Sequence, residues 1–182
     1  LQFDQYLGEM YMDINVYDNN ITIINRSFIS PISNIARNYY QFLITDSSYI
    51  DNQWCYKMSF RPKRTGDLTF EGEMWVHDTT YAIKSIKGTI AADANINYIQ
   101  DFYFEQNFDM VEKEVWMLTD ETMFANINVT QKSALYGVFV RKYSSRKKFI
   151  INKPHPDKFY ISNSTVEMAD SAKLRDEAYW IA

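Results

Sequence analysis

Apolar and polar residues alternate along most of the chain between residues 39 and 151. In the ranges 54–60, 68–76 and 102–108, large apolar side chains stand at about every second position, with charged or hydroxyl side chains between them. A period of two is typical of strands with one buried face. Polar stretches such as Asp46-Ser47-Ser48 and residues 61–67 end the runs. The pattern predicts about eight or nine short strands in an antiparallel sheet with one solvated face, the last strand at residues 149–151.

The two ends of the chain carry other patterns. The first stretch fits helical spacing at Phe3, Tyr6 and Met10, and it also fits a strand from Met10 to Val16. Near the other end, Ser164 with Glu167 has the spacing of a capping box, which predicts a helix over residues 165–180. The fold class expected from the residues is therefore mainly β (α+β), with few helices.

Composition sets limits on the class of protein. The 182 residues suit one domain spanning 1–182, and 46 % hydrophobic with 23 % charged residues is ordinary for a globular chain. A net charge of −4 disfavours nucleic-acid binding, and no apolar stretch approaches the ~20 residues of a membrane helix. The first residues lack a signal-peptide pattern, so a mature domain, an excised piece and a cytosolic protein all stay open.

Residues that carry chemistry are sparse. A single cysteine, Cys55, excludes an internal disulfide and a cysteine-based metal site. The two histidines, His77 and His155, have no spacing that suggests a shared metal site, and acidic pairs such as Glu71 with Glu73 fit a solvated strand face. We expect no catalytic residues, no metal and no cofactor.

Two surface features are candidate contact sites. A basic segment carries Arg141, Lys142, Arg146, Lys147 and Lys148, which suits an acidic partner or anionic headgroups, or else a solvated hairpin. A large aromatic side chain, Trp75, lies near His77 on a polar strand face, where it needs either a packed cover or a partner. With Trp180 in the aromatic C-terminal cluster, these residues form the predicted interaction patch.

Several segments in a fixed order carry a family resemblance. They include Phe60-Arg61-Pro62-Lys63-Arg64, Asp67-Leu68-x-Phe70-x-Gly72, Trp75-Val76-x-Asp78, and Arg175-Asp176-Glu177-Ala178-Tyr179-Trp180. Together they resemble an uncharacterised Bacteroidetes outer-membrane protein family. Its members run from a carboxypeptidase-regulatory-like domain through a region like this one to a predicted membrane β-barrel. The resemblance implies an excised domain in the periplasm, at the outer membrane of a Gram-negative bacterium. Its partners would be the chain's own β-barrel and neighbouring periplasmic domain, with an envelope protein or lipid as a further partner.

A second resemblance concerns shape. The segments Phe70-x-Gly72-x-x-Trp75-Val76-x-Asp78 and Ala82-Ile83-Lys84-x-Ile86 are similar to periplasmic lipoprotein-carrier domains. This similarity implies a strongly curved antiparallel sheet that forms an unclosed barrel, with helices across its concave side.

Three functions follow as hypotheses. The first is a non-enzymatic scaffold or interaction domain. The second is a carrier or sensor that holds an acyl chain or lipoprotein in the concave face, and the third is an enzyme using outer-face carboxylates. The carrier hypothesis rests on an aromatic and methionine-rich series: Tyr56, Met58, Phe60, Phe70, Met74, Phe102 and Phe104.

Overall fold

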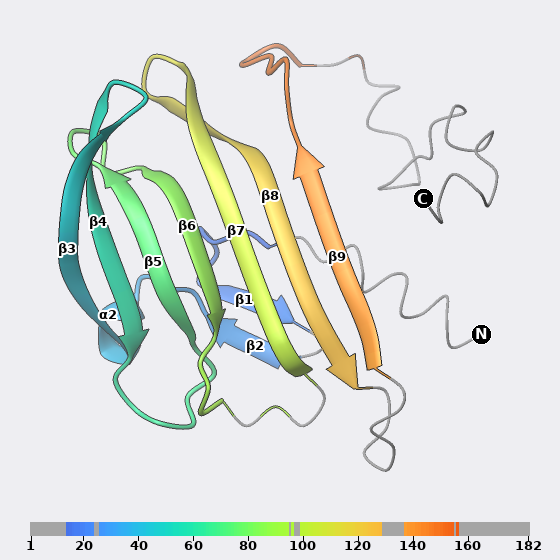
Figure 1. Cartoon of the computed structure of the whole chain (residues 1–182). Coiled ribbons are helices and arrows are strands. Elements are labelled where there is room, and N and C mark those ends of the chain that lie inside the picture. Colours follow the sequence, from blue (N-terminus) through green and yellow to red (C-terminus); the bar gives the residue numbers. More distant parts are fainter. Residues whose placement is uncertain are drawn as a thin grey trace. The chain divides into compact units, whose positions relative to one another are not determined.

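The structure is a computed structural model that describes residues 14–23, 26–94, 96, 99–128, 137–154 and 156. These residues form one short helix and nine strands (Figure 1). The elements are β1 (Asn20–Ile23), β2 (Arg26–Ile29), α2 (Ala36–Tyr39), β3 (Tyr40–Ile50), β4 (Gln53–Pro62), β5 (Phe70–His77), β6 (Ile83–Ile90), β7 (Ile99–Glu112), β8 (Val115–Asn128) and β9 (Gly137–Ser145).

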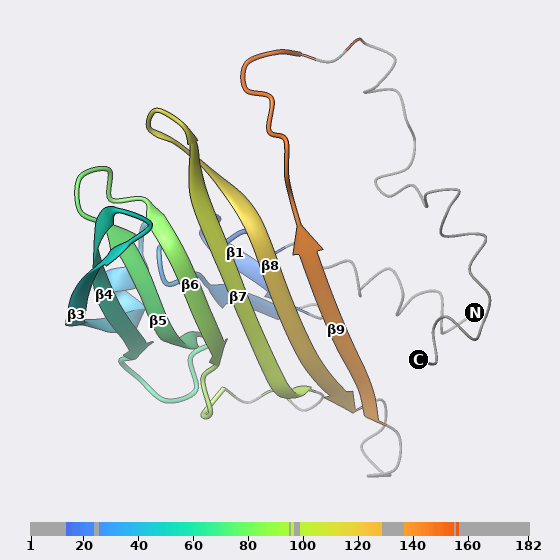
Figure 2. The same cartoon turned by 45° about the horizontal axis from the view of Figure 1, so that its top comes forward.

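Strands β3 to β9 form one seven-stranded sheet in chain order, and every neighbouring pair is antiparallel. The sheet is twisted and unclosed, with β3 and β9 at its two ends (Figures 1 and 2). The predicted mainly β fold with an open antiparallel sheet is therefore confirmed. Consecutive strands pair because the connections between them are short, which is the simplest way to build such a sheet.

The core lies on one face of the sheet, here called the inner face, against a two-stranded sheet of β1 and β2. The Phe28 ring of β2 contacts the Phe70 ring of β5, with centroids 5.2 Å apart, and both side chains are fully buried. The Tyr40 hydroxyl joins the two layers, because it donates to the Ile29 carbonyl and accepts from the Phe70 backbone N–H. Burial raises the pKa of Tyr40, so the hydroxyl stays protonated and keeps both bonds.

A pair of facing glycines makes room in this core. Gly72 of β5 lies opposite Gly88 of β6, and the Phe104 ring of β7 covers Gly88. A Cβ atom at Gly88 would lie 3.1 Å from that ring. A glycine in a strand interior is destabilising by itself, and an aromatic ring packed over it offsets the loss.

Alternation holds through most of the sheet and fails at particular positions. In β5 the Phe70 side chain is fully buried while Glu71 is exposed, as the pattern predicts. His77 and Cys55 were both expected on the solvated side but are buried, and the Trp116 ring lies 5.2 Å from the His77 ring. The expected strand at 149–151 is absent, because strand pairing of β9 ends at Ser145.

The chain divides into two compact units, residues 1–147 and 148–182. All the helices and strands above belong to the first unit. In the second unit the structure describes residues 148–154 and 156, and none of these lies in a helix or strand. The predicted strand from Met10 to Val16 reaches residues 14–16, which lie in no strand. Its earlier part, the alternative N-terminal helix, the predicted C-terminal helix at 165–180, His155 and Trp180 lie outside the described residues.

Candidate functional site

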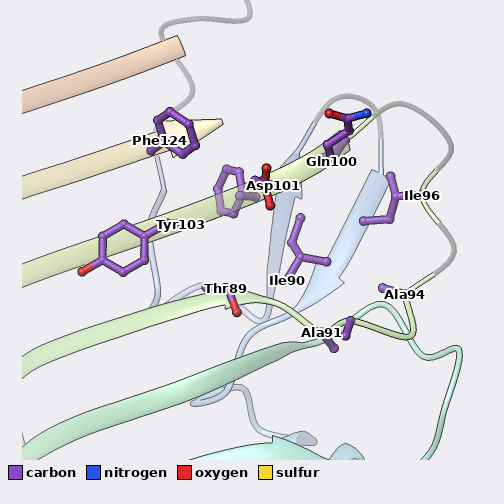
Figure 3. Close-up of a pocket in the computed structure, with 12 residues that line it drawn as sticks. Thr89, Ile90, Ala91, Ala94, Ile96, Gln100, Asp101, Tyr103 and Phe124 are labelled. Carbon is purple, nitrogen blue, oxygen red and sulfur yellow. The ribbon is translucent and has the colours of Figure 1, made fainter. Parts of the chain in front are cut away.

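One pocket lies where β6 and β7 part. The two strands are paired from Ser85↔Asn107 to Thr89↔Tyr103, and beyond that point β7 continues to Ile99 against β8 alone. The end of β6 turns away instead, since the Ala91 backbone N–H donates to the Thr69 carbonyl at 3.0 Å. The parted strands enclose a cavity of about 500 Å³ (Figure 3).

The lining of this pocket combines an apolar floor with a few polar groups. Ile90, Ala91 and Phe102 belong to the inner side, and Phe102 is buried in the core. Asp101 and Tyr103 lie on the opposite side, the outer face of the sheet, where Asp101 is exposed. A cavity of this size falls within the range of ligand sites, and its wall is about as polar as it is apolar. The remaining lining residues are Thr89, Ala92, Ala94, Ile96, Ile99, Gln100 and Phe124.

Two more hollows continue from the pocket along the outer face. A hollow of about 430 Å³ over β5 and β6 shares Thr89 and Tyr103 with the pocket. A smaller hollow of about 160 Å³ beside Trp75 shares Glu73 and Lys87 with the middle one. Because each hollow shares residues with the next, the three form one tract, which we call the outer-face groove.

The centre of the groove holds a fixed pattern of charge. Glu73 forms ion pairs with Lys57 at 2.7 Å and with Lys87 at 2.6 Å. The hydrogen bond from Lys57, followed by that from Lys87, lowers the pKa of Glu73, and the bond to Glu73 raises the pKa of Lys87. The Lys57 ammonium also lies 5.8 Å from the centre of the Trp75 ring, within the range of a cation–π contact. Trp75 is therefore partly covered by its own sheet.

Tyr103 links the middle hollow to the large pocket. Its hydroxyl donates to Glu105 Oε2 at 2.7 Å. Burial, together with this bond and the charge of Glu105, raises the pKa of Tyr103 to about 12. The phenol therefore stays protonated at neutral pH, with its ring as a wall of both hollows.

The residues expected to hold a hydrophobic ligand are distributed through the core. Phe60, Phe70, Met74, Phe102 and Phe104 are buried. Met58 is half-buried and Tyr56 is exposed. Of these seven residues only Phe102 lines the 500 Å³ pocket, and the aromatic rings mostly contact one another and the β1–β2 layer.

The basic segment is divided between two environments. Lys142 and Arg146 lie 3.0 Å and 3.5 Å from the Oε2 atom of Glu121, a carboxylate that is fully buried. Gln106 completes this cluster, since its amide donates to Glu121 Oε1 at 3.0 Å and also to the Ile14 carbonyl. Two of the five basic residues therefore serve a buried ion cluster on the inner face, while Arg141, Lys147 and Lys148 are exposed. Lys148 belongs to the second unit.

The two side chains with the greatest potential for chemistry, the Cys55 thiol and the His77 imidazole, are both buried. Cys55 pairs with His77 across β4 and β5, but the thiol is fully buried and burial raises its pKa. A protonated, inaccessible thiol is a poor nucleophile. His77 Nδ1 lies 2.8 Å from the Thr80 hydroxyl and accepts the Thr80 backbone N–H, which closes the turn between β5 and β6. Within the described ranges, no three His, Cys, Asp or Glu side chains converge as a metal site would require.

Some functional positions escaped the sequence reasoning. Gln106 lies between the inward-facing Phe104 and Phe108, and Glu121 lies two positions before the inward-facing Met123. A polar residue at an inward position of the alternation was the signal by which the sequence could have revealed these two residues. The alternation places Tyr103 and Asp101 only on the outer face. It does not predict that they line a pocket, because the sequence pattern of a single strand does not specify where two neighbouring strands separate.

A comparison with protein-family models matches residues 3–146 to a family of unknown function, DUF5686. The chain belongs to this family. No curated protein and no solved structure matches the chain. Among the residues that the structure describes, no helix has the length and apolar character needed to cross a membrane. The family match thus covers the whole sheet, including the groove, and assigns it no activity.

Proposed function

We propose that this chain is a non-enzymatic interaction domain whose outer-face groove binds a partner protein. The observation that carries the proposal is the groove itself, a continuous tract of three hollows open to solvent beside a tightly packed inner face. Its polar groups are held in place by ion pairs and hydrogen bonds, and such preorganisation reduces the entropy lost on binding.

The proposed setting is the periplasm, at the outer membrane of a Gram-negative bacterium. The support is the ordered set of sequence segments that resembles the Bacteroidetes outer-membrane family. In that setting the domain would lie between a neighbouring periplasmic domain and a membrane β-barrel of the same chain. Protease protection of the full-length protein in intact cells, lost after the outer membrane is opened, tests this placement.

Photo-crosslinking in native cells tests the interaction. A benzoylphenylalanine replaces Tyr103 in the groove, and in a matched variant it replaces Tyr49, a 70 % exposed tyrosine at the end of β3. We expect a defined protein adduct from position 103 that is absent from position 49. Equal adducts from both positions, or none from position 103, would refute a groove-bound partner.

The carrier hypothesis stays a prediction. The five buried members of its predicted series are occupied by contacts with the core, which does not favour an acyl chain at that place. Release of a fluorescent fatty acid by natural lipids, measured with the purified chain, would revive it.

A further inference from the structure

Strand β7 has an edge without a strand partner inside the large pocket. On the side of β6 its pairing stops at Tyr103, and the stretch Ile99–Phe102 has no ladder partner there among the described residues. On its other side the same stretch is paired with β8, including a bulge between Ile99 and Asp101. Unpaired backbone N–H and C=O groups on a strand edge can pair with another extended chain.

The opposite end of β7 is also unpaired on the side of β6, since that pairing stops at Asn107. There β7 also runs beyond β6, but Lys84 forms ion pairs with both Asp109 of β7 and Asp51 of the β3–β4 turn. Burial would lower the pKa of Lys84, yet the bonds to these two carboxylates outweigh it and raise the pKa. That end is closed by side chains, whereas the Ile99–Phe102 end opens on a pocket.

The pocket fits what an added strand brings with it. Alternate side chains of an extended peptide point to opposite sides. One set would face the apolar floor formed by Ile90, Ala91 and Phe102, and the other set would face solvent. From Ser85 to Ile90 the groove runs beside about 17 Å of β6, at ~3.3 Å per residue, so it accommodates a segment of several residues.

The charge of the groove selects a basic segment. Three carboxylates along it, Glu71, Asp101 and Glu105, form no ion pair with a lysine or arginine in the described part of the chain. Lys87, the lysine that lines the groove, and the neighbouring Lys57 are both bound to Glu73 instead. The unmatched charge is therefore negative, and complementary charge increases both the rate and the specificity of binding.

We propose that the groove binds an extended, basic peptide segment of a partner protein, and that part of this segment pairs as a strand with Ile99–Phe102 of β7. This inference rests on the proposed function and specifies its partner. Apolar side chains of the segment enter the pocket, and its lysine or arginine side chains lie near Glu71, Asp101 and Glu105.

Fluorescence polarisation with synthetic peptides tests the inference on the 182-residue chain. The probe is an alternating Lys–Val peptide of about eight residues, long enough to follow the groove. Two control peptides have the same length. One is an alternating Glu–Val peptide, and the other is the Lys–Val peptide with N-methyl groups at alternate residues, which remove the backbone N–H donors on the edge that would face β7. We expect binding of the Lys–Val probe, at least about tenfold weaker binding of the Glu–Val peptide, and loss of binding on N-methylation.

Variants locate the site. Replacing the three carboxylates together, Glu71→Gln, Asp101→Asn and Glu105→Gln, should weaken binding of the Lys–Val probe about tenfold, and added salt should have less effect than on the wild type. The control is Glu112→Gln, an exposed acid at the far end of the same strand. Backbone amide hydrogen exchange within Ile99–Phe102 should slow when the probe binds. Non-specific electrostatic binding of the peptide would leave the exchange rate of these amides unchanged.

Equal binding of the N-methylated probe, or unchanged amide exchange at Ile99–Phe102, would overturn strand pairing. Equal binding of the Glu–Val peptide, or an equal effect of Glu112→Gln, would overturn the basic segment. If no peptide binds while crosslinking at position 103 still captures a partner, the inference fails and the proposed function stands. If crosslinking also fails, both are lost.

Discussion

Replacing Gly72 by alanine tests whether the β5–β6 contact is as close as the structure shows. A Cβ atom built on Gly72 would lie 2.1 Å from the Lys87 carbonyl oxygen and 2.8 Å from the Gly88 Cα. Both atoms belong to the backbone of β6, which is fixed by pairing with β5 and β7. Neither atom can rotate away as a flexible side chain would, so two strands of the sheet must move apart.

The cost follows from that rigidity. Inserting extra volume into a packed region usually costs about 1–3 kcal/mol, with larger values where only backbone shifts can relieve the clash. An approach more than an ångström inside a normal contact of ~3.3 Å falls in the upper part of this range. We expect Gly72→Ala to lower the free energy of unfolding by about 3 kcal/mol or more, roughly a 150-fold change in the unfolding equilibrium.

Urea unfolding followed by tryptophan fluorescence measures this cost, with two glycine controls. At Gly88 a new Cβ would meet the Phe104 ring at 3.1 Å, and that ring can tilt, so Gly88→Ala should stay within about 1 kcal/mol of the wild type. At Gly66, with φ of 83° and no atom within 4 Å, alanine should cost about 1 kcal/mol from backbone strain alone. If Gly72→Ala proves no more destabilising than Gly66→Ala, the proposed close approach of the strands is wrong.

Three further outcomes are expected. Phe104→Ala removes a fully buried ring from the core and should cost about 3–5 kcal/mol in the same urea assay; a cost under about 1 kcal/mol would contradict its packing. Glu73→Gln should reduce stability at neutral pH. Because the folded-state pKa of Glu73 lies below the unfolded value, this carboxylate's contribution is present above the unfolded pKa and is lost as pH falls through the folded pKa. The difference between Glu73→Gln and wild type should therefore shrink in acid, and a difference independent of pH would contradict the ion pairs. Cys55 should react with an aromatic disulfide reagent at least about 100-fold more slowly in the folded chain than in urea, and equal rates would contradict its burial.

The alternation of side chains was enough to predict the sheet, because it depends on each strand alone. It placed Phe70 and Phe104 inside and Glu71 outside, as the structure has them. It failed at His77, where the ring of Trp116 covers a position that local alternation assigns to solvent. A period of two shows which side of a strand a residue lies on, but whether another element covers that side depends on tertiary structure.

The apolar run at 149–151 shows a second limit. Its composition suits a strand, yet a strand forms only where a neighbour supplies ladder partners, and pairing of β8 with β9 ends at Asp120↔Ser145. The basic segment shows a third limit, because Lys142 points to the inner face and reaches Glu121, a partner 21 residues earlier in the chain. Pairing between distant residues depends on register, which the sequence pattern does not specify.

The pocket at the end of β6 has a structural origin in the unequal lengths of neighbouring strands. β7 and β8 have 14 residues each, whereas β6 has 8, so β6 cannot cover the whole edge of β7. At one end, Lys84 forms ion pairs with Asp51 and Asp109, and these side chains bridge the stretch of β7 that extends beyond β6. At the other end no ion pair among the described residues bridges the shortfall, which produces both the pocket and the unpaired edge of Ile99–Phe102. An extension of β6 by a few paired residues would therefore remove the cavity and the unpaired edge together, so strand length is the feature on which the proposed binding depends.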